Sequence, residues 1–175
     1  MNLFRLIRSD IHAKARWLYG DESFRNLVKA RLTDGTTAMI LYRFMQWAQR
    51  HRLIPLAMLF NKLNVMGGCI IGRGADFGEG FVLVHSIGVV VNTSVKGGRN
   101  VILEQQVTIG AEKGLSPRLG DDIFIGAGAK ILGAIRLSNG TKVGANAVVL
   151  EDVPPGATVV GVPAKVVKIS PPGRQ

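Results

Sequence analysis

Two hydrophobic patterns divide the chain, and the first of them fills its N-terminal third. The segment DGTTAMILYRFMQWAQRHR (34–52) places apolar side chains at roughly helical spacing, with arginine and glutamine residues between them. Asp34 or Thr36 can cap the start of this helix, and Pro55 suits the first turn of the helix that follows. We therefore predict an N-terminal α-helical subdomain over residues 1–66, with about three or four helices.

The second pattern has a period of six residues and begins at Ile71. Large apolar residues occupy thirteen of the fourteen positions reached by steps of six. These positions hold Ile71, Phe77, Leu83, Val89, Val95, Val101, Val107, Leu119, Ile125, Ile131, Leu137, Val143 and Val149. A period of six is typical of a β-helix, in which each six-residue segment forms one face and three faces complete a coil. The chain is therefore predicted to be mainly β, with a left-handed parallel β-helix over residues 67–168.

The six-residue period fails once, at Lys113, inside the segment GAEKGLSPRLG (110–120). A loop over residues 111–118 that leaves the coil explains this failure, because the period is recovered at Leu119. Loops on a rigid scaffold often carry binding residues, so this loop is a candidate for function. A proline-containing C-terminal tail is predicted over residues 169–175.

The formal net charge of the chain is +10, and most of the basic excess lies in the predicted helical subdomain. The basic residues around the apolar run LIPLAMLF (53–60) are Arg43, Arg50, Arg52 and Lys62. They suit either a solvated helix face or a peripheral contact with an anionic membrane or glycan-lipid. The apolar run is too short to span a membrane. No recognised motif accompanies the charge, so nucleic acid is not an expected partner.

The cysteine content and the first residues bear on the cellular compartment. Cys69 is the only cysteine, which excludes an internal disulfide and fits a reducing compartment. The segment MNLFRLIRSDIH (1–12) is interrupted by charge too early to form the apolar core of a secretory signal. We therefore predict a cytoplasmic location.

Several segments resemble a known family. The segment IGAGAKILGAIRLSNGTKVGANAVVLEDVPPGATVVGVPAKVV (125–167) resembles the C-terminal part of the serine acetyltransferase-like group of hexapeptide-repeat acyltransferases. SDIHAKARW (9–17) and DGTTAMILYRFMQWA (34–48) resemble the N-terminal helical region of that group. LVHSIGVVVN (83–92) resembles the strand that carries its catalytic histidine.

This resemblance implies an enzyme, an O-acetyltransferase that uses acetyl-coenzyme A as its co-substrate. It also implies a homotrimer with active sites between neighbouring β-helices, in some relatives paired into a dimer of trimers. A flat β-helix face suits such an assembly. No metal is expected, because a β-helix carbonic anhydrase needs three histidine ligands and the predicted β-helix contains only His85.

His85 is the candidate catalytic residue. A histidine within an apolar strand is more often structural than catalytic when taken alone. His85, however, follows the interior position Leu83 by two residues, so it is expected near the end of a face, where it can point toward a neighbouring subunit. The resemblance aligns it with the general base of the family, which takes the proton from the acceptor hydroxyl as that oxygen attacks the thioester. Such assistance is typically worth about 10²–10⁴ in rate.

Other positions are candidates for the coenzyme and the oxyanion. Ala127 and Ala145 lie one predicted coil apart, and stacked small residues leave a shallow track for a pantetheine arm, although small residues also suit any tight corner. Lys165 and Lys168 are candidates for the phosphates, with solvated surface lysines as the alternative. The backbone N–H groups near Gly110 and Ala111 are candidate donors to the tetrahedral oxyanion.

The sequence departs from the family at three polar positions. The aspartate expected before the catalytic histidine is Val84, the second histidine expected in the loop is Ser116, and the expected orienting aspartate is Ile70. These losses favour a saccharide or glycan-precursor hydroxyl as acceptor. The alternatives are the L-serine O-acetylation of cysteine biosynthesis and, outside the enzymes, a structural or interaction β-helix in which His85 is inert.

Some polar residues can replace the missing contacts. The candidates for binding the acceptor are Asn92, Glu104, Gln105, Gln106, Ser116 and Asp21. Glu104 lies just over one coil after His85, so its carboxylate can fix the imidazole tautomer, unless it is simply exposed at a corner. Asp21 can either contact the acceptor or cap a helix.

Overall fold

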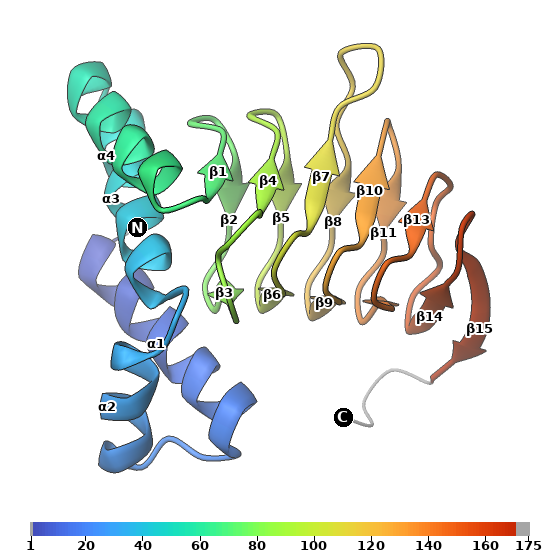
Figure 1. The fold of residues 1–175 in the computed structure, drawn as a ribbon, viewed down its shortest axis with the longest axis horizontal. Coiled ribbons are helices and arrows are strands. Elements are labelled where there is room, and N and C mark those ends of the chain that lie inside the picture. The colour runs from blue at the N-terminus through green and yellow to red at the C-terminus, as the bar shows by residue number, and fades with distance from the viewer. Residues whose placement is uncertain (1, 171–175) are drawn as a thin grey trace.

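The computed structural model describes residues 2–170, so residues 171–175 of the predicted tail lie outside the described range. The first part of the chain forms four helices. They are α1 (Leu3–Tyr19), α2 (Phe24–Leu32), α3 (Thr36–Arg50) and α4 (Ile54–Met66). In Figure 1 these helices lie together at one end of the molecule, beside the first strands of the β part.

The helix ends follow the local sequence only in part. Pro55 lies in the first turn of α4, where its missing N–H has no helical partner to lose. The predicted cap of α3 by Asp34 or Thr36 is wrong, because Gly35 occupies the N-cap position and no side chain caps that helix. Gly35 has a φ of 77°, a left-handed conformation that glycine adopts without strain. The carboxylate of Asp34 is thereby left available for another contact.

Up to residue 170, fifteen short strands follow the helices and wind into a β-helix (Figure 1). The first sheet contains β1 (Ile70–Ile71), β4 (Val90–Val91), β7 (Thr108–Gly110), β10 (Lys130–Leu132) and β13 (Val148–Val149). The second contains β2 (Asp76–Phe77), β5 (Lys96–Gly97), β8 (Arg118–Leu119) and β11 (Arg136–Leu137). The third contains β3 (Val82–Leu83), β6 (Val101–Leu103), β9 (Ile123–Ile125), β12 (Lys142–Val143), β14 (Ala157–Val160) and β15 (Lys165–Ile169).

The order of the strands confirms the predicted parallel β-helix behind a helical subdomain. From β1 to β12, each successive strand belongs to the next of the three sheets, so the chain turns continuously around one axis. Neighbouring strands within a sheet are parallel, except that β15 pairs antiparallel with β14. The interior is filled by stacked aliphatic side chains, each of which contributes about 1.5–3 kcal/mol by its burial. The stack in the first sheet is Ile71, Val91, Ile109, Ile131 and Val149, all at most 2% exposed.

The register of the middle coils differs from the strict six-residue period. Ile71 pairs with Val91 and Leu83 with Leu103, whereas the period predicted Val89 and Val101 as their partners. The difference arises in the turn between β3 and β4, which holds two more residues than the period allows. A shift of two residues leaves every side chain on the same face of a strand, so Val89 and Val101 remain buried.

The predicted loop is observed between β7 and β8, where Figure 1 shows the chain leaving the coil. Within the loop, an antiparallel bridge between Glu112 and Leu115 closes a tight turn around Lys113 and Gly114. The loop adds four residues beyond the period. Together with the two in the earlier turn they make a full step of six, which is why the period is recovered at Leu119.

A buried ion pair joins the helices to the first coil. Arg43 of α3 donates from Nε and Nη2 to the carboxylate of Asp10 of α1, at 2.6 and 3.0 Å, and both residues are at most 2% exposed. Arg43 also donates to the carbonyl of Phe77 at 2.8 Å and to that of Gly78. Asp10 accepts the backbone N–H of Phe81 at 2.9 Å. The two helices are thus held against the chain that leads into β3.

This arrangement corrects the expectation of a basic surface around residues 53–60. Arg43 is buried, and Arg50 pairs with Asp76 at 2.6 Å, so neither is a free surface cation. Within residues 2–170, no helix is both long enough and apolar enough to cross a membrane. The cytoplasmic location stays a prediction.

A buried lysine fastens the turn between α2 and α3. Lys14 of α1 is fully buried, and its Nζ donates to the backbone carbonyl of Asp34 and, at 3.0 Å, to Oγ1 of Thr36. Burial lowers the pKa of Lys14 from its ordinary value of 10.5 to about 8, and the charge of Asp34 opposes this shift. The turn is therefore held by a side chain whose charge is costly to bury.

We expect Arg43→Met to lower the free energy of unfolding by about 3–5 kcal/mol, because it leaves the carboxylate of Asp10 buried without its partner. Urea unfolding measures the loss. The control is Arg50→Met, which breaks a partly exposed pair and should cost no more than about 1 kcal/mol. Equal losses in the two variants would contradict the importance of the buried pair.

We also expect the stability of the wild type relative to Lys14→Met to rise between about pH 8 and pH 10. In this window the unfolded chain still binds the lysine proton that the folded chain has released, so raising the pH favours the folded state. Urea unfolding of both proteins across this range tests the trend, with Lys62→Met, an exposed lysine of α4, as the control. A constant difference between wild type and Lys14→Met would show that Lys14 is not affected by burial in this way.

Candidate active site

His85 lies in the enlarged turn that connects β3 to β4. The strand register continues one residue past β3, where the N–H of Val84 donates to the carbonyl of Leu103 at 2.9 Å. Val84 itself is buried in a small apolar cluster that also contains Ala13 and Val82. The next side chain, that of His85, is 52% exposed. The two additional residues of this turn therefore carry the imidazole out of the coil, as the prediction of an outward-pointing His85 requires.

A carboxylate from the helical subdomain approaches this imidazole. Oδ2 of Asp34 lies 3.4 Å from Nδ1 of His85. The approach depends on Gly35, because a Cβ at that position would lie 2.5 Å from the carbonyl oxygen of Leu83. The sequence pattern gave no sign of this contact, because Asp34 lies far from His85 in the chain and was expected to cap a helix.

Five other residues predicted for the site lie at the same corner of the β-helix, in the turns that lead from the third sheet to the first. Glu104, Gln105 and Gln106 lie between β6 and β7, Ala127 between β9 and β10, and Ala145 between β12 and β13. The carboxylate of Glu104 accepts the N–H of Ala127 at 3.1 Å. Glu104 is thus turned toward the next coil, and it is Asp34 that forms the ion pair recorded for His85 within residues 2–170. The turns form one edge that runs from His85 along the axis.

The remaining predicted loop residues lie at a different corner, where the chain passes from the first sheet to the second. Gly110 ends β7, and Ala111 is exposed at the start of the loop. Ser116 donates from Oγ to Oδ1 of Asn92 at 3.0 Å. A cavity of about 320 Å³ beside them is lined by Ser94, Ser116, Arg118 and Arg136, among others. Within one chain, the first sheet therefore separates these residues from His85.

Asp21 and the two C-terminal lysines have local roles in the described structure. Asp21 accepts the N–H of Ser23 at 2.7 Å and the side-chain amide of Asn26 at 2.9 Å, and these hydrogen bonds lower the pKa of its carboxyl group. Asp21 therefore organises the turn before α2, but the capping alternative is wrong, because Ser23 occupies the N-cap position and no side chain caps that helix. Lys165 and Lys168 are exposed on β15, and Lys165 lies 3.9 Å from Glu151.

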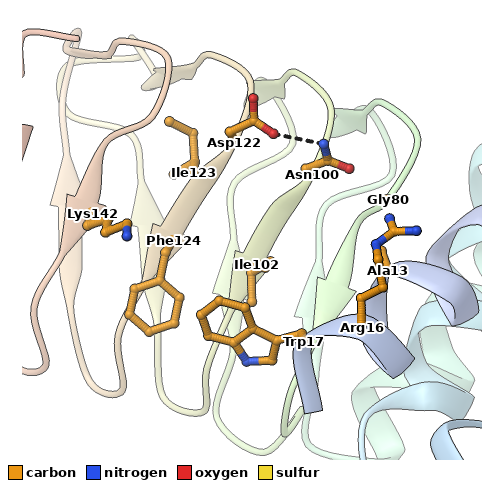
Figure 2. Close-up of a pocket in the computed structure, with 10 residues that line it drawn as sticks. All are labelled: Ala13, Arg16, Trp17, Gly80, Asn100, Ile102, Asp122, Ile123, Phe124 and Lys142. Carbon is orange, nitrogen blue, oxygen red and sulfur yellow. Dashed lines mark hydrogen bonds between the residues drawn. The ribbon is translucent and has the colours of Figure 1, made fainter. Parts of the chain in front are cut away.

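The sequence pattern did not predict a cavity of about 260 Å³ between α1 and the third sheet. Figure 2 shows Trp17 stacked on Phe124 there, with their ring centroids 5.0 Å apart. Asn100 donates to Asp122 at 2.8 Å on the wall of the same cavity. The available signal was the outward position of Phe124, which lies between the inward-facing residues of β9. Within residues 2–170, no group of three or more His, Cys, Asp or Glu side chains is placed to hold a metal ion.

Comparison with known proteins identifies relatives along nearly the whole chain. The chain is 36% identical to the serine acetyltransferase of Bacillus subtilis over 170 residues, which cover 94% of this chain and 77% of that protein. It is 37% identical to the serine acetyltransferase of Helicobacter pylori over 158 residues, which cover 87% of this chain and 92% of that protein. No protein-family model matches the chain.

Solved structures share the arrangement of helices and β-helix. Soybean serine acetyltransferase complexed with serine has a TM-score of 0.84 at 33% identity, covering 94% of this chain and 69% of that one. A serine acetyltransferase in complex with CoA has a TM-score of 0.85 at 31% identity, covering 94% and 69%. The chain therefore belongs to the serine acetyltransferase family of hexapeptide-repeat β-helix transferases and is an acetyl-coenzyme A-dependent O-acetyltransferase.

Proposed function

We propose that the acceptor is L-serine and that the chain is a serine O-acetyltransferase. The observation that carries this proposal is the 36–37% identity, over most of the chain, to proteins named serine acetyltransferase. These relatives support serine better than the saccharide hydroxyl favoured by the losses at Ile70, Val84 and Ser116. The products are O-acetylserine and free coenzyme A.

The exposed imidazole of His85 supplies the base for this reaction. It accepts the proton of the serine hydroxyl while that oxygen attacks the thioester carbonyl carbon of acetyl-coenzyme A. The tetrahedral oxyanion then collapses, the carbon–sulfur bond breaks, and the departing sulfur receives the proton from the imidazolium. The row of turns through Ala127 and Ala145 provides the track for the pantetheine arm, and the exposed Lys165 and Lys168 are proposed partners for the phosphates.

The division of the site between two corners supports a homotrimer. His85 lies at one edge of the first sheet, whereas Asn92, Gly110, Ala111 and Ser116 lie at the other. A neighbouring β-helix can bring its loop edge against the His85 edge of the first, and a three-fold ring satisfies all such contacts at once. The acceptor site and the oxyanion donors near Gly110 are then completed by the adjacent copy.

A saccharide hydroxyl is the second candidate acceptor. Val84 is buried in an apolar cluster where the family resemblance implies an aspartate, and Ser116 is bonded to Asn92 where it implies a histidine. These residues remove ionic contacts to a zwitterionic amino acid while leaving the chemistry at His85 unchanged. The attack of a sugar hydroxyl on the thioester follows the same steps.

Release of coenzyme A from acetyl-coenzyme A, measured with L-serine and separately with sugars and nucleotide sugars, should show turnover with serine. His85→Ala should lower kcat by about 10²–10⁴, the usual contribution of a general base. His51→Ala, which changes an exposed histidine after α3, is the control. Turnover with a saccharide alone would overturn the choice of serine, and full activity of His85→Ala would overturn the mechanism.

Co-expression of two inactive variants tests whether the site is shared between copies. His85→Ala and Ala111→Trp each disable one half of the site, and Ala111 is exposed, so its replacement leaves the core intact. Every mixed trimer contains one site with two native halves, so random mixing should restore about a quarter of the wild-type activity. Activity that stays at the level of the single variants would show that each chain carries a complete site.

A further inference from the structure

The ion pair between the helical subdomain and the catalytic turn suggests a role for Asp34. Its Oδ2 lies 3.4 Å from Nδ1 of His85. Neither Val84 nor Ile70, the positions at which the resemblance implies aspartates, can supply a carboxylate. We propose that Asp34 is the positioning residue of His85 and replaces an orienting carboxylate from the β-helix. This proposal rests on the proposed role of His85 as general base.

The nitrogen that faces Asp34 determines what the other nitrogen can do. A carboxylate beside Nδ1 favours the tautomer with its proton on Nδ1, and this leaves the lone pair of Nε2 free to accept the proton of the acceptor hydroxyl. The same carboxylate stabilises the imidazolium that forms during attack. The 3.4 Å separation is longer than a good hydrogen bond, but catalytic contacts in a free enzyme are often long and shorten when substrate binds.

The backbone of Asp34 is held from two sides, although its side chain is 84% exposed. Lys14 donates a hydrogen bond to the backbone carbonyl of Asp34. Gly35 packs against the carbonyl of Leu83 with a positive φ that other residues rarely adopt. Leu83 lies only two residues before His85. The turn between α2 and α3 is therefore held beside the strand that leads to His85, which keeps the backbone of Asp34 within reach of the imidazole.

Other charged groups near the pair are already bonded. Lys14 of α1 is bonded to the backbone carbonyl of Asp34 and to Thr36. Glu104, in the turn of the next coil, accepts the N–H of Ala127. An exposed ion pair such as that of Asp34 and His85 contributes little to folding stability. Stabilisation of the fold is therefore a poor explanation for this contact.

The test is ¹⁵N NMR of the neutral imidazole in the full chain, with the signals of His85 assigned by their absence in His85→Ala. We expect wild type to show the tautomer protonated at Nδ1 and Asp34→Asn to shift toward the tautomer protonated at Nε2. The readout needs no acceptor, so it separates failure of this proposal from failure of the proposed function. The same tautomer in both proteins would overturn the role of Asp34.

Kinetics provide a second measurement on the same variants. Asp34→Asn should lower kcat by about 10–100-fold, as loss of an orienting partner typically does, with the KM for acetyl-coenzyme A little changed. Asp34→Glu should recover part of the loss. The control is Glu79→Gln, which removes the carboxylate of a partly exposed pair with Arg5 at another corner. A kcat for Asp34→Asn equal to that of Glu79→Gln would contradict the proposal.

Discussion

Closing each coil around a narrow interior forces every additional residue out at a corner of the β-helix. The stacked side chains of Ile71, Val91, Ile109, Ile131 and Val149 leave no room inside, so strands of two to five residues alternate with turns. The chain exceeds its six-residue period at two corners, the turn that holds His85 and the loop over residues 111–118. At these two corners, polar side chains such as those of His85 and Ser116 lie outside the coil. The packing of the core thus determines where chemistry can occur.

The helical subdomain adds what the β-helix cannot provide. A turn of a β-helix offers few side chains around an outward-pointing imidazole, and the neighbouring Val84 is apolar and buried. The ion pair of Asp10 with Arg43 and the bonds of Lys14 hold α1 and α3 against the first coil. They bring the turn between α2 and α3 to the strand before His85, where the absence of a side chain at Gly35 permits contact. The role of the helices is therefore to place Asp34 beside His85, and they need no binding surface of their own for this.

The fold could be predicted because the six-residue period records the inward-facing positions directly. The prediction missed the register of the middle coils, since Val89 and Val91 both face inward and a shift of two residues leaves no mark on the hydrophobic pattern. It placed His85 outside the coil and offered Glu104 as a carboxylate partner, with an exposed glutamate at a corner as the alternative. The contact with Asp34 depends on how helices pack on the first coil, which a periodic pattern does not encode. The three substituted positions favoured a saccharide acceptor, whereas the relatives support serine better.

The decisive measurement is a crystal structure of the protein with coenzyme A and L-serine. We expect the sulfur of the coenzyme beside Nε2 of His85, the pantetheine arm along the turns of Ala127 and Ala145, and the 111–118 loop of a neighbouring copy over the acceptor. Coenzyme bound elsewhere, for example in the cavity of Trp17 and Phe124, with His85 facing solvent, would contradict it.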